Sequence, residues 1–184
     1  MNGSVESGKD RLKKIAESIP AGARLAPPDY ERMKSVWLEK LNELYGNIKN
    51  WLGGISNISI EEAPISIHEE YIGNYEATKL IIYIGTSSVV LIPRGTIIIA
   101  AEGRIDVQSS NGKQSMIVLV RKGQRPRFEV RMTVGDEEAP ALPMRENSSS
   151  TEEYEWLIVG ERRGKDFTVL IEETFSTLIA DLIE

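Results

Sequence analysis

The sequence contains no cysteine and only one histidine among its 184 residues. The lack of cysteine excludes disulfide bonds, thiolate metal sites and cysteine nucleophiles together. It also favours a reducing compartment, so we expect a cytoplasmic protein. A serine nucleophile of the triad type needs a histidine base, and His68 is the one histidine that could serve it.

Long apolar runs are also missing. No run approaches the roughly 18 apolar residues that a membrane-spanning helix needs, and the first residues are polar and charged. We therefore expect no membrane segment and no secretory leader. With 184 residues, the chain is long enough to bury a core without disulfides or metals.

A basic excess is absent as well, since 22 Lys and Arg face 28 Asp and Glu, for a net charge of −6. The excess acid lies in residues 55–184, with 13 basic and 21 acidic residues, whereas residues 1–54 have nine and seven. Because an acidic body repels phosphate backbones, we do not expect nucleic-acid binding.

The stretch GSVESGKD near the start resembles the opening of a phosphate-binding loop through Gly3, Gly8 and Lys9. Such a loop needs a strand before it and a Ser or Thr after the lysine. Only two residues precede Gly3, and Asp10 follows Lys9. The stretch therefore predicts an N-terminal segment that leads into a helix, and not a nucleotide site.

Two helices are predicted in residues 1–54, which we interpret as an N-terminal helical arm. The first covers residues 9–19, and Pro20 ends it. The second begins after Asp29, a good N-cap, and ends near Leu52, before the glycine pair that follows. Its apolar residues from Trp37 onward step by four and three, as in a heptad seam. The seam consists of Trp37, Leu41, Leu44, Ile48 and Trp51.

Residues 55–184 predict an antiparallel β domain, because short turns separate the apolar segments. The Asn111-Gly112 pair is the strongest hairpin signal, and a further turn is predicted at Pro93-Arg94-Gly95. The segment 96–107 reads as one long strand, covered on both faces at first, with a bend or bulge at Gly103. The expected strands are 78–84, 88–92, 96–107, 114–122, 128–134, 154–159 and 166–171, with a further short one at 58–60.

The end of the chain predicts an amphipathic helix from Phe175 to Ile183 that closes the core. Residues 135–153 are rich in acid, serine and proline, which is typical of a flexible loop. The predicted fold class is therefore α+β: a curved antiparallel sheet or partly open barrel of about seven to eight strands, with the helical arm and the closing helix.

Three groups of polar residues are candidate sites, each with an alternative. His68 lies beside Glu69 and Glu70, but neighbours on a strand point to opposite faces, which favours a solvated histidine. The alternating Glu102, Arg104 and Asp106 could grip a polar ligand at the mouth of the barrel, or form a solvent-facing charge ladder.

The third group is the basic segment 121–131, which could contact phosphates and stack a base on Phe128. The alternative is a hairpin loop followed by a strand with Phe128 in the core. Its basic members are Arg121, Lys122, Arg125, Arg127 and Arg131.

The seam on the second helix is the best candidate for an interface with a partner or a second copy, and its alternative is packing on the protein's own sheet. We find no catalytic motif, and we expect no cofactor and no metal. The sequence therefore favours a non-catalytic cytoplasmic interaction or structural module acting through the N-terminal helix. The alternative is a small-ligand binding protein or enzyme with a pocket near Glu102, Arg104 and Asp106.

Overall fold

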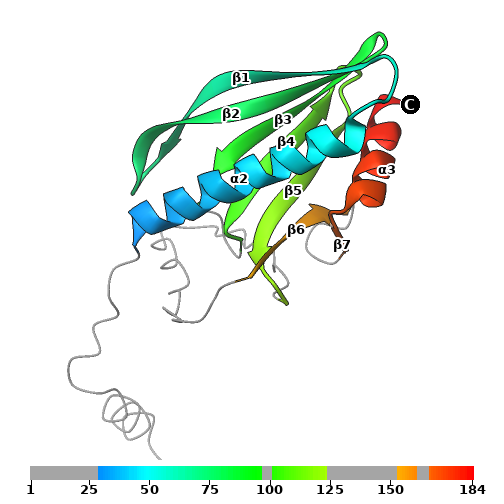
Figure 1. Cartoon of the computed structure of the whole chain (residues 1–184). Coiled ribbons are helices and arrows are strands. Elements are labelled where there is room, and N and C mark those ends of the chain that lie inside the picture. Colours follow the sequence, from blue (N-terminus) through cyan, green and yellow to red (C-terminus); the bar gives the residue numbers. More distant parts are fainter. Residues whose placement is uncertain (1–28, 97–100, 124–152, 161–165) are drawn as a thin grey trace, which may run out of the picture.

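In the described part of the chain, seven strands follow one another across a single antiparallel sheet in chain order, with one helix before them and one after them in the sequence (Figure 1). The computed structural model describes residues 29–96, 101–123, 153–160 and 166–184. The α+β class and the open antiparallel sheet are thereby confirmed. The elements are α2 (Tyr30–Leu52), β1 (Ile58–Glu69), β2 (Gly73–Ile84), β3 (Ser87–Gly95), β4 (Gly103–Ser109), β5 (Gln114–Arg121), β6 (Tyr154–Val159), β7 (Phe167–Val169) and α3 (Glu172–Ile183).

Some expected features lie outside the described residues. They are the phosphate-loop-like stretch, the helix at 9–19, the strand at 128–134 and, except for Glu153, the acidic loop at 135–153. The first half of the expected long strand, residues 97–100, also lies outside them.

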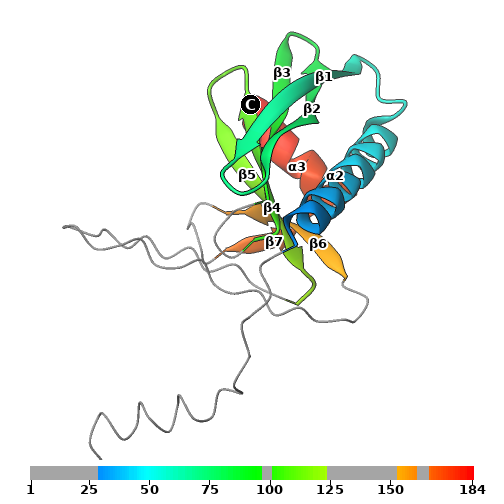
Figure 2. The same cartoon turned by 90° about the vertical axis from the view of Figure 1, so that its left-hand side faces the viewer.

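Helix α2 forms where the seam predicts it. The Asp29 carboxylate caps its start by accepting a hydrogen bond from the backbone N–H of Arg32 at 3.0 Å. Gly53 ends it, and Gly54 follows at φ 82°, a conformation that favours glycine. Figure 1 shows the helix running across one face of the sheet, and Figure 2 shows the same packing from the side.

The face of the sheet that α2 covers carries the main core. It combines alternate residues of β2 to β5, such as Leu80, Leu91, Ile105 and Ile117, with the apolar stripe of α2. Helix and sheet therefore share one core, so α2 is not a free arm.

The hairpin of β1 and β2 is much longer than the sequence predicts, at 12 residues for each strand. Only the last part of β2, from Leu80 to Ile84, pairs with β3. The buried side also changes along the ribbon: Ile82 is buried near its base, whereas Ile67 and Ala77, of opposite parity, are buried near its tip. Two-stranded ribbons twist strongly, and this twist brings the tip back toward α2.

The predicted turn at Pro93–Gly95 is wrong. Strand β3 continues through Gly95, and its pairing with β4 shifts register between Pro93 and Gly95. Gly95 has φ 114°, which explains the glycine without a chain reversal. The bend or bulge predicted at Gly103 of β4 is thus found in the neighbouring strand β3, as the register shift between Pro93 and Gly95.

Helix α3 closes the end of the core as predicted. Its residues Phe175, Ile179 and Leu182 are buried, and the Phe175 ring lies 5.7 Å from the ring of Trp51. The Thr174 hydroxyl accepts a hydrogen bond from the N–H of Ile171 at 2.9 Å, which fixes the start of the helix. Figure 1 shows α3 beside the C-terminal end of α2.

Candidate functional site

The seam residues of α2 face the protein's own sheet. Trp37, Leu41, Leu44 and Ile48 are at most 2% exposed, and Trp51 is half-buried. Intramolecular packing, the alternative to a partner helix, therefore accounts for the seam. In this fold a partner cannot reach these four side chains.

The position of the Trp37 ring explains why residue 103, at the start of β4, is a glycine. A Cβ atom on Gly103 would lie 2.2 Å from Cε3 of the Trp37 ring, far inside contact distance. The ring also lies 5.9 Å from that of Trp156 on β6. Gly103 is therefore needed for the close approach of helix and sheet, and not for a bend in the strand.

The structure divides the expected polar site of β4. Arg104 and Asp106 lie on the face of the strand away from α2 and line a cleft with a volume of about 670 Å³. Glu102 does not line this cleft. Its carboxylate lies 3.3 Å from Nε of Arg121 in an ion pair.

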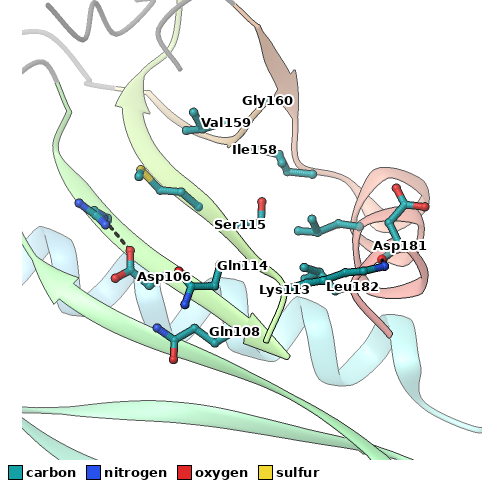
Figure 3. Close-up of a pocket in the computed structure, with 13 residues that line it drawn as sticks. Asp106, Gln108, Lys113, Gln114, Ser115, Ile158, Val159, Gly160, Asp181 and Leu182 are labelled. Carbon is teal, nitrogen blue, oxygen red and sulfur yellow. Dashed lines mark hydrogen bonds and ion pairs between the residues drawn. The ribbon is translucent and has the colours of Figure 1, made fainter. Parts of the chain in front are cut away.

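The cleft exists because β6 is shorter than β5. The last pair between them joins Met116 to Val159, so Gln114 and Ser115 extend past the end of β6. Helix α3 closes this space from the other side, and Lys113 Nζ donates to the backbone oxygen of Asp181 at 2.8 Å. Figure 3 shows side chains of β4, β5, β6 and α3 around the space.

The walls of the cleft differ in polarity. The polar wall comes from β4 and the start of β5. The apolar wall comes mainly from β5, β6 and α3, although Asp181 of α3 and Lys113 also line this side. The polar residues include Arg104, Asp106, Gln108, Gln114 and Ser115, and the apolar ones are Met116, Ile158, Val159, Leu178 and Leu182. Such a site fits a molecule with one polar and one apolar part.

Asp106 forms two ion pairs at the cleft. One carboxylate oxygen accepts from Arg104 Nε at 2.6 Å, and the other accepts from Arg94 Nε at 2.7 Å. The Asp106 side chain is 15% exposed, and those of Arg104 and Arg94 are 37% and 46% exposed. The charge ladder expected in β4 is therefore a cluster that spans two strands.

His68 lies far from this cleft in the fold, on the exposed side of β1. Its Nδ1 lies 2.7 Å from the side-chain oxygen of Asn74, directly opposite on β2. Glu69 points the other way and is buried. Neighbouring positions on this strand thus separate histidine and carboxylate, as the alternation predicts.

Glu69 joins the tip of the β1–β2 hairpin to the end of β3. Its carboxylate accepts from the N–H of Thr96 at 2.9 Å and from the Tyr75 hydroxyl at 2.5 Å. A Cβ atom on Gly95 would lie 2.6 Å from the Glu69 carboxyl carbon, so the contact needs glycine there. Burial, together with the bond to Glu69 and its charge, raises the pKa of Tyr75.

In the described part of the basic segment, the two basic side chains each form an ion pair with a glutamate. Arg121 pairs with Glu102, and Lys122 Nζ lies 2.7 Å from the Glu153 carboxylate. The Lys122 bond lowers the pKa of Glu153 and raises that of Lys122. Arg125, Arg127 and Arg131 lie outside the described residues.

Sequence reasoning missed most of the cleft. Arg104 and Asp106 stood out as alternating charges, but Arg94, which pairs with Asp106 beside the cleft, was assigned to a turn. Ser115 and Leu178 carry no chemical signal of a site, because only the unequal lengths of β5 and β6 bring them together.

Comparison with protein-family models, with curated proteins and with solved structures finds no match to this chain. Among the described residues, no cluster of three or more His, Asp or Glu could hold a metal ion. In the same part of the chain, neither helix has the length and apolar character that a membrane crossing requires.

Proposed function

We propose that the protein binds a small amphipathic molecule in the cleft between β4, β5, the end of β6 and α3, and acts as a binding module without catalysis. The observation that carries this proposal is the division of the cleft into a polar and an apolar wall. Its volume of about 670 Å³ is within the range of small-molecule sites, roughly 300–1,000 Å³. The cysteine-free sequence favours the cytoplasm as the place of binding.

Interaction through the N-terminal helix, the function that the sequence favours, would need an apolar surface on α2. The seam is instead in the core, and the exposed residues of α2 are polar, such as Glu39, Asn42 and Asn47. The cleft is the better supported site for this reason.

The first test is native mass spectrometry of the full-length protein, purified without detergent. We expect a reproducible adduct of small mass that organic extraction removes. Ser115→Trp should abolish the adduct, because the indole fills the cleft. The matched control is Ser66→Trp on the exposed side of β1, which should keep it.

A ligand added back should raise the melting temperature of the wild type and of Ser66→Trp, since binding to the folded state stabilises it. An adduct that persists in a folded Ser115→Trp variant would contradict binding in this cleft.

A further inference from the structure

The pairing around Asp106 leaves a positive charge at one end of the cleft, where Arg104 and Asp106 line it and Arg94 lies beside the lining, bonded to Asp106. Arg94 and Arg104 carry two positive charges, and the carboxylate between them carries one negative charge. Each oxygen of the Asp106 carboxylate accepts a hydrogen bond from one arginine Nε–H group. The cluster of Arg94, Asp106 and Arg104 therefore has a net charge of about +1.

The terminal nitrogens of both guanidinium groups remain available. Across the described residues, neither Arg94 nor Arg104 makes a further hydrogen bond or ion pair. The Nη groups are the planar donors that match a carboxylate or a phosphate. Asp106 fixes both side chains in advance, which lowers the entropy cost of binding an anion.

The apolar wall begins next to this cluster. Asp106 lies opposite Met116 in the β4–β5 ladder, and Met116 lies opposite Val159 in the β5–β6 ladder. Leu178 and Leu182 of α3 line the same cleft from the other face of the sheet, past the end of β6. A bound molecule thus meets charge on β4 and hydrocarbon from β5 onward (Figure 3).

Among the described residues, the opposite end of the cleft carries one charge of each sign, on Lys113 and Asp181. Lys113 Nζ is also held by the backbone oxygen of Asp181 on α3. An anionic group is therefore favoured at the arginine end over the α3 end, because only the arginine end has a net positive charge. This asymmetry sets the orientation of the molecule.

We infer that the ligand is an amphipathic anion, whose carboxylate or phosphate contacts Arg104 and is attracted by Arg94 beside it, and whose hydrocarbon lies along Met116 and Val159 toward α3. This inference rests on the proposed function, because it names the ligand class of the same cleft.

The test is isothermal titration of the full-length protein with undecanoate, decyl phosphate, decanol and decyltrimethylammonium, each below its micelle threshold. All four carry the same decyl chain, so the differences report the head group. We expect both anions to bind at least about tenfold more tightly than decanol, and the cation to bind most weakly. A tighter decyl phosphate identifies a phosphate ligand, and a tighter undecanoate a carboxylate ligand.

Arg104→Gln should lower the affinity for both anions about tenfold and leave that for decanol unchanged. Lys49→Gln, on the far side of the molecule where Lys49 pairs with Glu62, should change none of the four. Raised salt should weaken the anions selectively. Circular dichroism and melting temperature verify that each variant is folded.

The outcomes separate the two proposals. If decanol binds as tightly as the anions, or if a folded Arg104→Gln variant keeps the preference for anions, the ligand class is wrong and the cleft still binds. If none of the four compounds binds and no adduct is found, the proposed function itself is wrong.

Discussion

At the scale of single residues, two glycines determine how closely elements approach one another. Gly103 lets the Trp37 ring lie on β4, and Gly95 lets the Glu69 carboxylate reach β3. Gly95 also needs its positive φ, whereas Gly103 does not. At Gly103, therefore, the only obstacle to a side chain is space.

Gly103→Ala should destabilise the protein by roughly 1–3 kcal/mol or more, because the new methyl group overlaps the Trp37 ring. The control is Gly46→Ala within α2, where a Cβ atom meets nothing within 4 Å. That change should instead stabilise the protein by up to about 1 kcal/mol through helix propensity. Urea denaturation of both variants measures the effects, and equal stability of the two would contradict the packing described at Gly103.

The residue scale also shows where sequence reasoning succeeds. Asp29 as N-cap, Gly53 as helix end and the Asn111-Gly112 turn are correct, because each depends on local backbone chemistry. Arg94 was placed in a turn because Pro and Gly flank it. Whether such a triplet reverses the chain or forms a shifted register depends on the partner strand, which the local sequence does not specify.

At the scale of elements, the periodic pattern of α2 correctly predicts a helix but not what it packs on. The same stripe can cover a sheet or a second helix, and the burial of Trp37 and Ile48 shows that it covers the sheet. The cleft is harder to predict, because it depends on where β6 ends relative to β5 and α3.

Trp37→Ala should destabilise the protein by about 3–5 kcal/mol, because it removes a fully buried ring that Gly103 and Trp156 contact. The oligomeric state of the remaining folded protein should not change. Asn42→Ala on the exposed face of α2 is the control and should shift stability by less than about 0.5 kcal/mol. Urea denaturation and native mass provide the two readouts. Loss of an oligomer without loss of stability would point back to an interface on α2.

The sequence analysis predicted less than half of the β1–β2 hairpin, for a different reason. Glu61 and Glu62 break the alternation of apolar residues, and Pro64 argues against a strand. Strand β1 accommodates both because it lies at the edge of the sheet, where one side has no partner strand among the described residues. The twist also changes which face of the ribbon is buried along its length. Apolar and polar residues therefore do not alternate regularly over the whole strand, and the sequence pattern does not reveal it.

At the scale of the whole molecule, two tyrosines should make the free energy of unfolding depend on pH in the alkaline range. Burial and the nearby charge of Glu62 raise the pKa of Tyr45, and burial with the bond to Glu69 raises that of Tyr75. The Tyr45 hydroxyl is buried, and among the described residues it has no hydrogen-bond partner. In the unfolded chain both groups should titrate near about 10.

Stability should therefore be constant with respect to these two groups below about pH 10 and fall above it, because only the unfolded state then releases their protons. Each tyrosine contributes a slope of about 1.4 kcal/mol per pH unit above pH 10. Tyr45→Phe should remove one such contribution and cost little stability at neutral pH, since the lost hydroxyl has no partner in the described part of the chain. Urea denaturation from pH 8 upward checks whether the free energy of unfolding falls above about pH 10. A slope unchanged by Tyr45→Phe would refute the burial of that hydroxyl.

The position of α2 at the start of the described fold has a consequence for synthesis of the protein. The ribosome makes Trp37 before the β4 and β5 residues that share its core, such as Ile105 and Leu119. At about 5–20 residues per second, the apolar stripe of α2 stays uncovered for several seconds while the strands are made. Each new strand then pairs with the strand just completed, so the sheet can grow in the order of translation. During that interval the seam is a surface that chaperones can bind, although the finished protein hides it.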